Sequence, residues 1–355
     1  MVESKIRAAI VGCGRMGAFP SPSYKYLPPN WLPISHIDSL ICNANIVVVG
    51  AVEKSKTVRE SVEKKYEIPT YENLDSLFRN NQVDLLTVAT RTPAKYGIIK
   101  AAYDNGVRLF HIEKPLCNSM EELKKLEVLL SDCSFTYGCL RRYVTPFKNV
   151  NKYASDNKLG RIKLVQVCLG QSMLYWTHTH AIDYLLMQIE SPPKLVQAVF
   201  DSIDLSADGT TVTKDPVLKN ATIYFKNGEV GHVSSVPGNT FIHVYEHGEI
   251  TIKNDGNSVI LSRKLGDDPY PKETLIDITQ NENGSTGNAI SLLSNAYLEG
   301  GKHKQQVDLA RDAALLGQKI MFAMIESHIN GGKSVSIAEL NKPYTLKALF
   351  NGVPA

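Results

Sequence analysis

Short apolar runs alternate with helical patterns over the first 140 residues of this 355-residue chain. The runs that predict strands are residues 6–11, 46–52, 84–89, 107–112 and a less apolar stretch at 134–137. Helical patterns lie between them at 58–66, 94–103 and 120–130, the last with Ser119 as its N-cap and Glu122 in capping-box position. Strands that are apolar on both faces need helices on both sides, so the alternation predicts a parallel, doubly wound α/β sheet of the Rossmann type.

From about residue 160 the expected strands follow one another directly. They are residues 163–169, 194–200, 221–225, 230–235, 241–247 and 249–253, with turn sequences such as Lys226-Asn227-Gly228 between them. One helix at 180–188 lies near their start, and amphipathic helices at 288–298 and 305–328 come after them. This pattern predicts an α+β domain with a large, mostly antiparallel open sheet. We therefore expect two domains, residues 1–140 and residues 141–355.

A proline-rich stretch interrupts the first helix of the first domain. Residues 19–34 contain five prolines, which exclude a regular helix, and the helical pattern resumes only at 35–40. We interpret the stretch as an inserted loop. Two interpretations stay open, a surface loop without a role and a wall of a ligand pocket. Trp31 and two tyrosines favour the wall.

Composition and charge exclude several classes of partner. The net charge is +3, and basic and acidic residues are interspersed, so nothing indicates a nucleic-acid partner. No run of eighteen apolar residues occurs, and the first five residues lead straight into a strand without a secretory signal, so we expect a cytoplasmic protein without a membrane partner. The six cysteines include no C-x-x-C pair, which favours reduced thiols and no metal site.

The first strand ends in a glycine motif that is typical of a dinucleotide site. Gly12-Cys13-Gly14-Arg15-Met16-Gly17 is G-x-G-x-x-G, whose glycines allow a tight turn and a close approach of backbone to a pyrophosphate. Glu53 ends the second strand, where a carboxylate binds ribose hydroxyls and repels a 2′-phosphate. The expected cofactor is therefore NAD. Lys54 and Lys56 follow directly, so NADP stays possible.

Further motifs bring a family resemblance. They are Ala89-Thr90-Arg91-Thr92-Pro93, Glu113-Lys114-Pro115-Leu116, Gly138 through Arg141-Arg142-Tyr143 with Pro146, and Leu159-Gly160. With the glycine motif, they make the chain resemble the glucose-fructose oxidoreductase, inositol dehydrogenase and rhizopine-catabolism (Gfo/Idh/MocA) family over nearly its whole length. The resemblance implies an NAD(P)-binding Rossmann domain and a substrate-binding open-sheet domain, assembled through that sheet as a homodimer or homotetramer.

The resemblance also implies roles for individual residues. Lys114 is the catalytic lysine, which reaches the nicotinamide and the reacting hydroxyl, and an ammonium there stabilises a developing oxyanion. Besides Lys114 and the glycine turn with Arg15 and Met16, the residues expected near the dinucleotide are Thr90, Glu113 and Arg142. His111, on the same strand as Lys114, is interpreted as a packing residue.

A second motif carries the expected base. The family pattern is Asp, three residues, His, two residues, Asp, and this chain has Trp176 in the first position, followed by His180 and Asp183. His180 is expected to accept the proton of the hydroxyl, with Asp183 orienting the imidazole. We expect Trp176 and His178, with Lys114 and His180, to contact substrate.

These residues predict an oxidoreductase acting on CH–OH groups. The hypothesis is NAD(P)-dependent hydride transfer to or from a secondary hydroxyl of a sugar, a sugar derivative or a cyclitol. The replacement of the family aspartate by Trp176 leaves two alternatives open. One is an NAD-dependent glycosidase that works by transient oxidation, and the other is a nucleotide-binding regulator with impaired catalysis.

Overall fold

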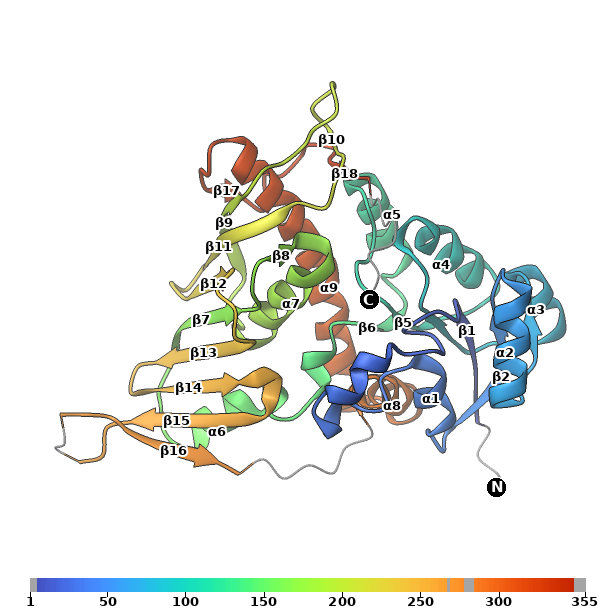
Figure 1. Ribbon diagram of the computed structural model, residues 1–355, viewed down its shortest axis with the longest axis horizontal. Coiled ribbons are helices and arrows are strands. Elements are labelled where there is room, and N and C mark those ends of the chain that lie inside the picture. Colours follow the sequence, from blue (N-terminus) through green and yellow to red (C-terminus); the bar gives the residue numbers. More distant parts are fainter. Residues whose placement is uncertain (1–4, 267–268, 278–283, 348–355) are drawn as a thin grey trace.

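Two β-sheets with helices packed against them make up the protein (Figure 1). The structure is a computed structural model, which describes residues 5–266, 269–277 and 284–347. The first four residues, which the expectation about a secretory signal used, lie outside these ranges. In the described ranges, none of the helices has the length and apolar character needed to cross a membrane.

The first sheet confirms the expected parallel α/β architecture. Its six strands run in the order β3-β2-β1-β4-β5-β6, and every neighbouring pair is parallel. The strands are β1 Ile6–Val11, β2 Ile46–Val52, β3 Thr70–Tyr71, β4 Leu85–Val88, β5 Leu109–Ile112 and β6 Ser134–Tyr137. The helices of this domain are α1 His36–Ile41, α2 Lys56–Tyr66, α3 Leu74–Asn80, α4 Lys95–Asp104 and α5 Met120–Leu129.

The start of α5 differs from the expected capping box in one contact. The Ser119 hydroxyl accepts the N–H of Glu122 at 3.1 Å, as expected. The Glu122 carboxylate, however, reaches the N–H of Asn118 at 3.0 Å, one residue before the cap. Both contacts satisfy amides that the helix itself leaves without acceptors, so the sequence pattern located the helix start correctly.

The second sheet is mixed and mostly antiparallel. Its main path is β16-β15-β14-β13-β7-β12-β11-β9-β17, with β8 beside β11. The strands are β7 Ile162–Cys168, β8 Ser172–Met173, β9 Pro193–Phe200, β11 Val217–Phe225, β12 Val230–Ser234, β13 Thr240–Tyr245, β14 Gly248–Lys253, β15 Ser258–Arg263, β16 Lys272–Ile276 and β17 Val335–Ser336. A separate parallel pair joins β10 Thr211–Val212 to β18 Thr345–Leu346. The expected antiparallel succession is broken at one place, where β7 and β12 pair in parallel.

Four more helices and several short turns complete the described part of the chain. The helices are α6 Val150–Asp156, α7 Thr179–Gln188, α8 Ser285–Glu299 and α9 Gly301–Ile329. The 3₁₀ turns are η1 Pro22–Tyr26, η2 Pro29–Trp31, η3 Thr92–Ala94, η4 Leu140–Tyr143, η5 Phe147–Asn149 and η7 Asn254–Gly256, and η6 Leu174–His178 is a π-helical turn. Helix α7 begins directly where η6 ends, so residues 174–188 form one continuous helical segment.

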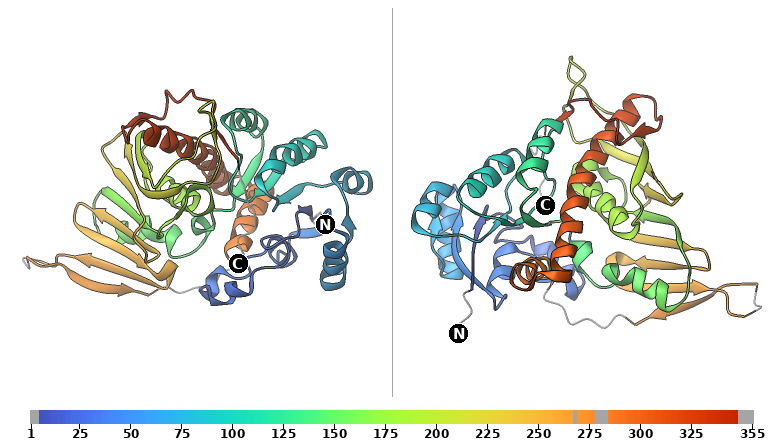
Figure 2. Two further views of the ribbon diagram at one scale, coloured as in Figure 1. Left: turned by 45° about the horizontal axis from the view of Figure 1, so that its top comes forward. Right: turned by 180° about the vertical axis from the view of Figure 1, so that it is seen from behind.

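Helix α9 lies between the two sheets (Figures 1 and 2). It packs on β6 of the first sheet and on β9 of the second. Its buried residues lie on several sides of the helix, including Val307, Gln318, Phe322 and Ser327. From Ala313 onward the helix is buried on most sides and so must have protein on opposite sides, whereas its first turns are largely exposed. One continuous apolar core therefore includes both sheets and α9, and the expected boundary at residues 140 and 141 stays a prediction.

The inserted stretch leaves and re-enters one interrupted helix. Residues 14–18 form a single turn in which the N–H of Ala18 donates to the Gly14 carbonyl at 2.9 Å, so the first helix is interrupted as the sequence predicts. Helix α1 then resumes with its N–H groups bonded across the insertion, from His36 to the Met16 carbonyl at 2.8 Å and from Ile37 to the Gly17 carbonyl at 3.0 Å. Ser35 caps this start through the N–H of Asp38. The insertion therefore adds chain without displacing the elements on either side of it.

The insertion packs against the second domain, and this corrects the interpretation of Trp31 as a ligand-facing wall. Trp31 is 6% exposed. Its ring meets Phe147 edge-on with centroids 6.2 Å apart, and its indole N–H donates to the Asp255 carbonyl at 3.3 Å. Asn30 donates to the Thr145 carbonyl at 2.7 Å. Trp31 is therefore a buried anchor between the two domains.

Removing this anchor should destabilise the fold. A Trp31→Ala variant should lose roughly 3 kcal/mol of unfolding free energy, because a buried aromatic ring is replaced by a cavity. Tyr26 of the same insertion is 79% exposed, so Tyr26→Ala should change the unfolding free energy by about 0.5 kcal/mol or less. Urea unfolding followed by circular dichroism measures both. Equal losses in the two variants would show that Trp31 does not anchor the insertion.

Candidate active site

The glycine turn after β1 is packed tightly on two sides and open on a third. Gly12 has φ +90°, and a Cβ there would lie 2.9 Å from the Ala89 carbonyl oxygen and 3.0 Å from Thr90 Cγ2. A Cβ on Gly17 would lie 2.0 Å from the Gly12 oxygen, whereas one on Gly14 would meet nothing within 4 Å. The turn therefore offers its open backbone at Gly14, which fits the close approach of a dinucleotide pyrophosphate.

Glu53 lies beside this turn, as expected from its place at the end of β2. Its Oε2 accepts the N–H of Cys13 at 3.0 Å, and its Oε1 accepts the N–H of Ser55 at 3.0 Å. Each oxygen keeps a second lone pair with which to accept a ribose hydroxyl. The turn and the carboxylate together fit a dinucleotide whose ribose has free hydroxyls.

Lys95 holds the backbone on either side of Lys114. This lysine begins α4, is completely buried, and donates through Nζ to the carbonyls of Glu113 and of Pro115, the latter at 2.6 Å. Burial lowers the pKa of Lys95 to about 7, although the nearby charge of Glu113 opposes the shift. The residues that flank Lys114 in the chain are thus fixed by one buried ammonium group.

Lys114 reaches across to the second domain. Its Nζ donates to the Trp176 carbonyl at 2.5 Å and lies 4.5 Å from the centroid of the Trp176 ring. The guanidinium of Arg15 lies 5.4 Å from the same ring, so Trp176 lies between the glycine turn and the lysine. Burial lowers the pKa of Lys114, while Glu113, Cys139 and Asp215 act against the shift.

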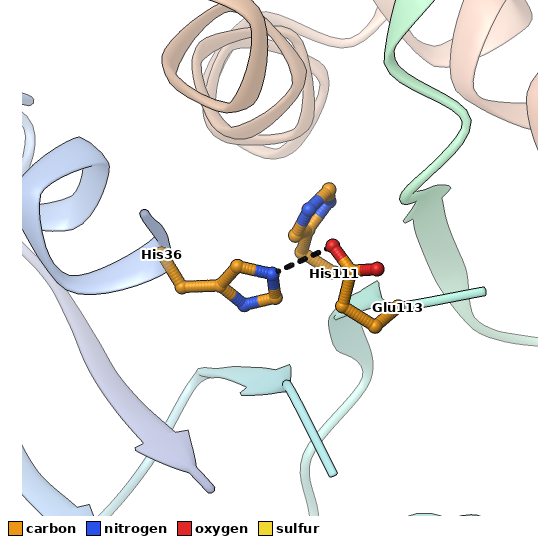
Figure 3. Close-up of side chains that lie close together, drawn as sticks. All are labelled: His36, His111 and Glu113. Atoms are coloured by element: carbon orange, nitrogen blue, oxygen red, sulfur yellow. Dashed lines mark hydrogen bonds and ion pairs between the residues drawn. The ribbon is translucent and has the colours of Figure 1, made fainter. Parts of the chain in front are cut away.

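Glu113 belongs to a buried cluster with two histidines (Figure 3). His36 Nε2 lies 3.2 Å from Glu113 Oε1, and His111 Nδ1 lies 2.9 Å from Thr136 Oγ1. Burial alone would raise the pKa of the Glu113 carboxyl, but His36, then His111 and Lys95, hold it below its usual value. Burial lowers the pKa of His111 to about 3, which keeps this ring neutral.

The buried cluster of His36, His111 and Glu113 lies directly before Lys114 in the fold and holds the residue that precedes it. The candidate metal-ligating atoms of His36, His111 and Glu113 lie within 4.8 Å of one another. Each side chain has one hydrogen-bond partner, while His36 Nδ1 and His111 Nε2 have none among the described residues. The carboxylate is enclosed between His36 and Gly138, where a Cβ would come within 2.8 Å of it. Glu113 thus points into the protein, and its expected contact with the dinucleotide stays a prediction.

The structure separates the expected pair of His180 and Asp183. Asp183 is bound instead by Arg142, whose guanidinium reaches both carboxylate oxygens, at 2.8 Å and 3.3 Å. Burial raises the pKa of Asp183, and Arg142 opposes the shift. The i+3 spacing placed both side chains on α7 correctly, but Arg142 from η4 forms a charge-assisted pair that a neutral imidazole cannot match. Asp183 therefore orients Arg142, and the expectation that it orients His180 is corrected.

His180 lies one helical turn beyond Trp176, whose carbonyl accepts Lys114 Nζ. Burial lowers the pKa of His180 far below its usual value, and the positive charges of Lys114 and Arg141 lower it further. Its Nδ1 is enclosed and has no hydrogen-bond partner within the described ranges. The imidazole is therefore neutral at physiological pH and can accept a hydrogen bond from a hydroxyl, although the lowered pKa makes it a weaker base than an ordinary histidine.

His178 and Trp176 differ in their access to a ligand. His178 is completely buried, and burial lowers its pKa to about 4. Trp176 is 39% exposed. The π-helical turn therefore directs the two side chains differently, and a surface for substrate is consistent with Trp176 but not with His178 as it lies here. Both roles stay predictions.

Sequence reasoning missed Lys95 and Asp215. Lys95 begins a helix after Pro93, a place where a lysine is usually solvated, and only its burial reveals its role. Asp215 lies in a loop before β11, yet its carboxylate accepts the N–H groups of Tyr175 and Trp176 at 2.9 Å and 3.0 Å. No spacing rule connects these two residues to the motifs, so the sequence held no signal for either.

Comparison with known proteins agrees with this geometry. Residues 6–135 match the oxidoreductase family with an NAD-binding Rossmann fold that is named Gfo/Idh/MocA. The match covers the Rossmann part of the chain, which is similar to the Gfo/Idh/MocA oxidoreductases. The family resemblance, the oxidoreductase class and the NAD cofactor expected from the sequence are thereby confirmed. A comparison with curated protein sequences gives no match.

Solved structures share the fold over nearly the whole chain. Aldose-aldose oxidoreductase from Caulobacter crescentus, solved with glycerol, is 17% identical with a TM-score of 0.72, over 94% of this chain and 99% of that one. An oxidoreductase from Agrobacterium radiobacter with NAD+, L-tartaric acid and magnesium is 13% identical, TM-score 0.70, over 94% and 99%. UDP-N-acetylglucosamine 3-dehydrogenase from Acidithiobacillus ferrooxidans is 15% identical, TM-score 0.62, over 87% and 95%. At these identities the likeness shows the fold.

Two glycine variants should separate binding from folding. Gly14→Ala should weaken NADH binding roughly tenfold or more while leaving the unfolding free energy unchanged, because the new methyl group occupies only the open face of the turn. Gly17→Ala should reduce both, with a loss of about 2 kcal/mol or more in unfolding free energy from the clash with the Gly12 oxygen. Fluorescence titration with NADH and urea unfolding measure the two effects. Unchanged NADH affinity in Gly14→Ala would rule out the assigned binding face.

Replacing Lys95 should change how stability depends on pH. Its pKa is about 7 when folded and 10.5 as an ordinary lysine. Between these values the unfolded chain binds more protons, so raising the pH stabilises the fold, by at most about 1.4 kcal/mol per pH unit. Below pH 7 both states are protonated, and this contribution is constant.

The Lys95→Met variant lacks this proton. The unfolding free energy of the unsubstituted protein minus that of Lys95→Met should therefore rise from pH 7 to pH 10 and stay level below pH 6. Lys124 on α5 is exposed, so the same difference taken with Lys124→Met should be flat throughout. Urea unfolding at a series of pH values measures both differences. A flat curve for Lys95→Met would contradict the lowered pKa.

Proposed function

We propose that the protein catalyses NAD(P)-dependent hydride transfer to or from a secondary hydroxyl of a sugar, a sugar derivative or a cyclitol. The observation that carries this proposal is the meeting of Lys114 from the first domain with His180 from the second, near the glycine turn. Lys114 Nζ donates to the Trp176 carbonyl at 2.5 Å, and His180 follows one helical turn later on the same segment, so both groups can act on one substrate. Two structural neighbours, an aldose-aldose oxidoreductase and a UDP-N-acetylglucosamine 3-dehydrogenase, support the substrate class.

Each group has one task in this proposal. The nicotinamide ring, when bound, supplies the hydride acceptor or donor. Lys114 is cationic and donates a hydrogen bond to the reacting oxygen, which stabilises the negative charge that grows there when an alcohol is oxidised. His180 is neutral and accepts the hydroxyl proton, and it returns that proton in the reverse reaction. Trp176 offers a flat apolar surface to a sugar ring.

The glycine turn and Glu53 bind the dinucleotide. The open backbone at Gly14 takes the pyrophosphate, with Arg15 and Met16 beside it and Thr90 behind Gly12. Glu53 accepts ribose hydroxyls, which favours NAD over NADP. Arg142, held by Asp183, is kept as a residue lining this side. We place the dinucleotide in residues 1–140 and the substrate in residues 141–355.

The proposal extends to assembly and location. Helices α7 and α9 cover one face of the second sheet (Figure 2). Along β12 and β13, buried side chains alternate with half-buried ones on the opposite face. Copies of the chain assemble through this second face of the sheet, opposite α7 and α9, into a homodimer or homotetramer. We place the enzyme in the cytoplasm, with small molecules as its ligands.

A substrate screen with a lysine variant tests the reaction. Inositols, free sugars and nucleotide-activated sugars are each supplied with NAD or with NADP, and the absorbance of the reduced nicotinamide is followed. With the best substrate, Lys114→Ala should lower kcat by roughly 10³-fold or more, because the developing oxyanion loses its charge-assisted donor. NADH affinity should fall by much less than kcat, because the glycine turn and Glu53 remain in place. Full turnover by Lys114→Ala would refute the assignment.

The same screen distinguishes the two alternatives. Release of free sugar from a glycoside without net reduction of added NAD would indicate a glycosidase that works by transient oxidation. Tight NADH binding without turnover of any compound would indicate a regulator. The unchanged chain and Lys124→Met serve as the active references in each assay.

A further inference from the structure

The backbone of Trp176 is held from two directions. Its N–H donates to Asp215 Oδ2 at 3.0 Å, and its carbonyl accepts Lys114 Nζ at 2.5 Å. Asp215 Oδ1 also accepts the N–H of Tyr175 at 2.9 Å. One residue of the second domain therefore connects a carboxylate to the ammonium group of the candidate active site.

Asp215 caps the start of η6, although it lies about 40 residues further along the chain. Tyr175 and Trp176 lie at the start of η6, where the N–H groups have no acceptor inside the helical turn. The loop before β11 also binds the turn through the Pro216 carbonyl, which accepts the N–H of Leu174 at 2.9 Å. Two neighbouring residues of one loop thus fix three successive amides of η6.

Asp215 and Lys114, which both bind the Trp176 backbone, also interact through their charges. Lys114 faces Glu113 and Cys139 in its own domain, Asp215 and His180 in the second, and Arg15 in the glycine turn. Among these groups Asp215 brings a negative charge from the second domain and favours the ammonium form of Lys114. Burial raises the pKa of Asp215 to about 6, while the two amides and Lys114 oppose the shift.

The position of Asp215 bears on the unusual Trp176. Where the family motif has an aspartate, this chain has an indole, which carries no charge. We propose that Asp215 supplies the negative charge at this place and is a positioning residue for Lys114. It fixes the Trp176 backbone that receives the lysine, and it keeps the lysine protonated. The inference rests on the proposed function only in that Lys114 is taken as the group that meets substrate.

Competitive acetylation of lysines tests the inference without turnover. The protein is treated with trace acetic anhydride at a series of pH values, and peptide mass spectrometry gives the labelling rate of Lys114. Because only the neutral amine reacts, the pH midpoint reports the protonation of Lys114 and the plateau reports its accessibility. In Asp215→Asn the midpoint should move to lower pH, with a severalfold higher rate at pH 8.

Two matched variants complete the test. Asp156→Asn makes the same chemical change at a carboxylate paired with Lys152 on α6, and its Lys114 midpoint should equal that of the unchanged protein. Asp215→Glu keeps the charge and should return the midpoint toward that of the unchanged protein, which also covers the case in which Asp215→Asn fails to fold. An unmoved midpoint in folded Asp215→Asn, or a midpoint in Asp215→Glu as low as in Asp215→Asn, would overturn the inference.

Turnover provides a second readout once the screen yields a substrate. The alkaline limb of the kcat profile should move to lower pH in Asp215→Asn by the same amount as the labelling midpoint, with KM changed less than twofold. A moved midpoint without turnover on any compound supports the inference and argues against the proposed function. Lys114-dependent turnover with an unmoved midpoint overturns the inference and leaves the proposed function standing.

Discussion

The burial of α9 between the two sheets is the constraint on which the rest of the structure depends. Lys114 lies at the carboxyl end of a strand of the first sheet, and His180 lies on α7, which packs against α9 together with the second sheet. Because α9 is enclosed by both, the two sheets share one apolar core. The distance between Lys114 and His180 is therefore set by close packing and not by a flexible connection between independent units.

Buried polar groups then fix the details that apolar packing leaves open. The ammonium of Lys95 holds the carbonyls on either side of Lys114, and Asp215 holds the amides of the turn that receives the Lys114 side chain. Each is a charged group taken out of water, which is unfavourable unless its partners are well placed. Their contacts are therefore specific to one arrangement of the two domains, and they direct the lysine toward a single position.

Much of the fold follows from periodicity alone. Strands β1, β2 and β6 have the bounds that the apolar runs predict, and Ser119 marks the start of α5 as its side chain suggested. The predictions that failed concern contacts between distant segments. The parallel pairing of β7 with β12 follows from the order of strands in the sheet, which local sequence does not encode. Trp31 looked like a pocket wall because composition does not show what an aromatic ring packs against.

The candidate site divides in the same way. The glycine turn, Glu53 and Lys114 could be located because their chemistry is tied to the ends of strands, where spacing is informative. The partner of Asp183 could not, because Arg142 is 41 residues away and competes with a neighbour three residues away. Lys95 and Asp215 were beyond reach for a related reason, since a charged residue in a sequence looks the same whether it is solvated or buried.

The interrupted helix of the first domain has a consequence for how such chains diversify. The first N–H groups of α1 bond to the carbonyls of Met16 and Gly17, so the inserted residues 19–34 begin and end at nearly the same point in space. Segments of different length can be accepted there without moving the residues that face the cofactor. Changes in the insertion can thus alter the packing between the two domains without changing the geometry of the nucleotide-binding turn.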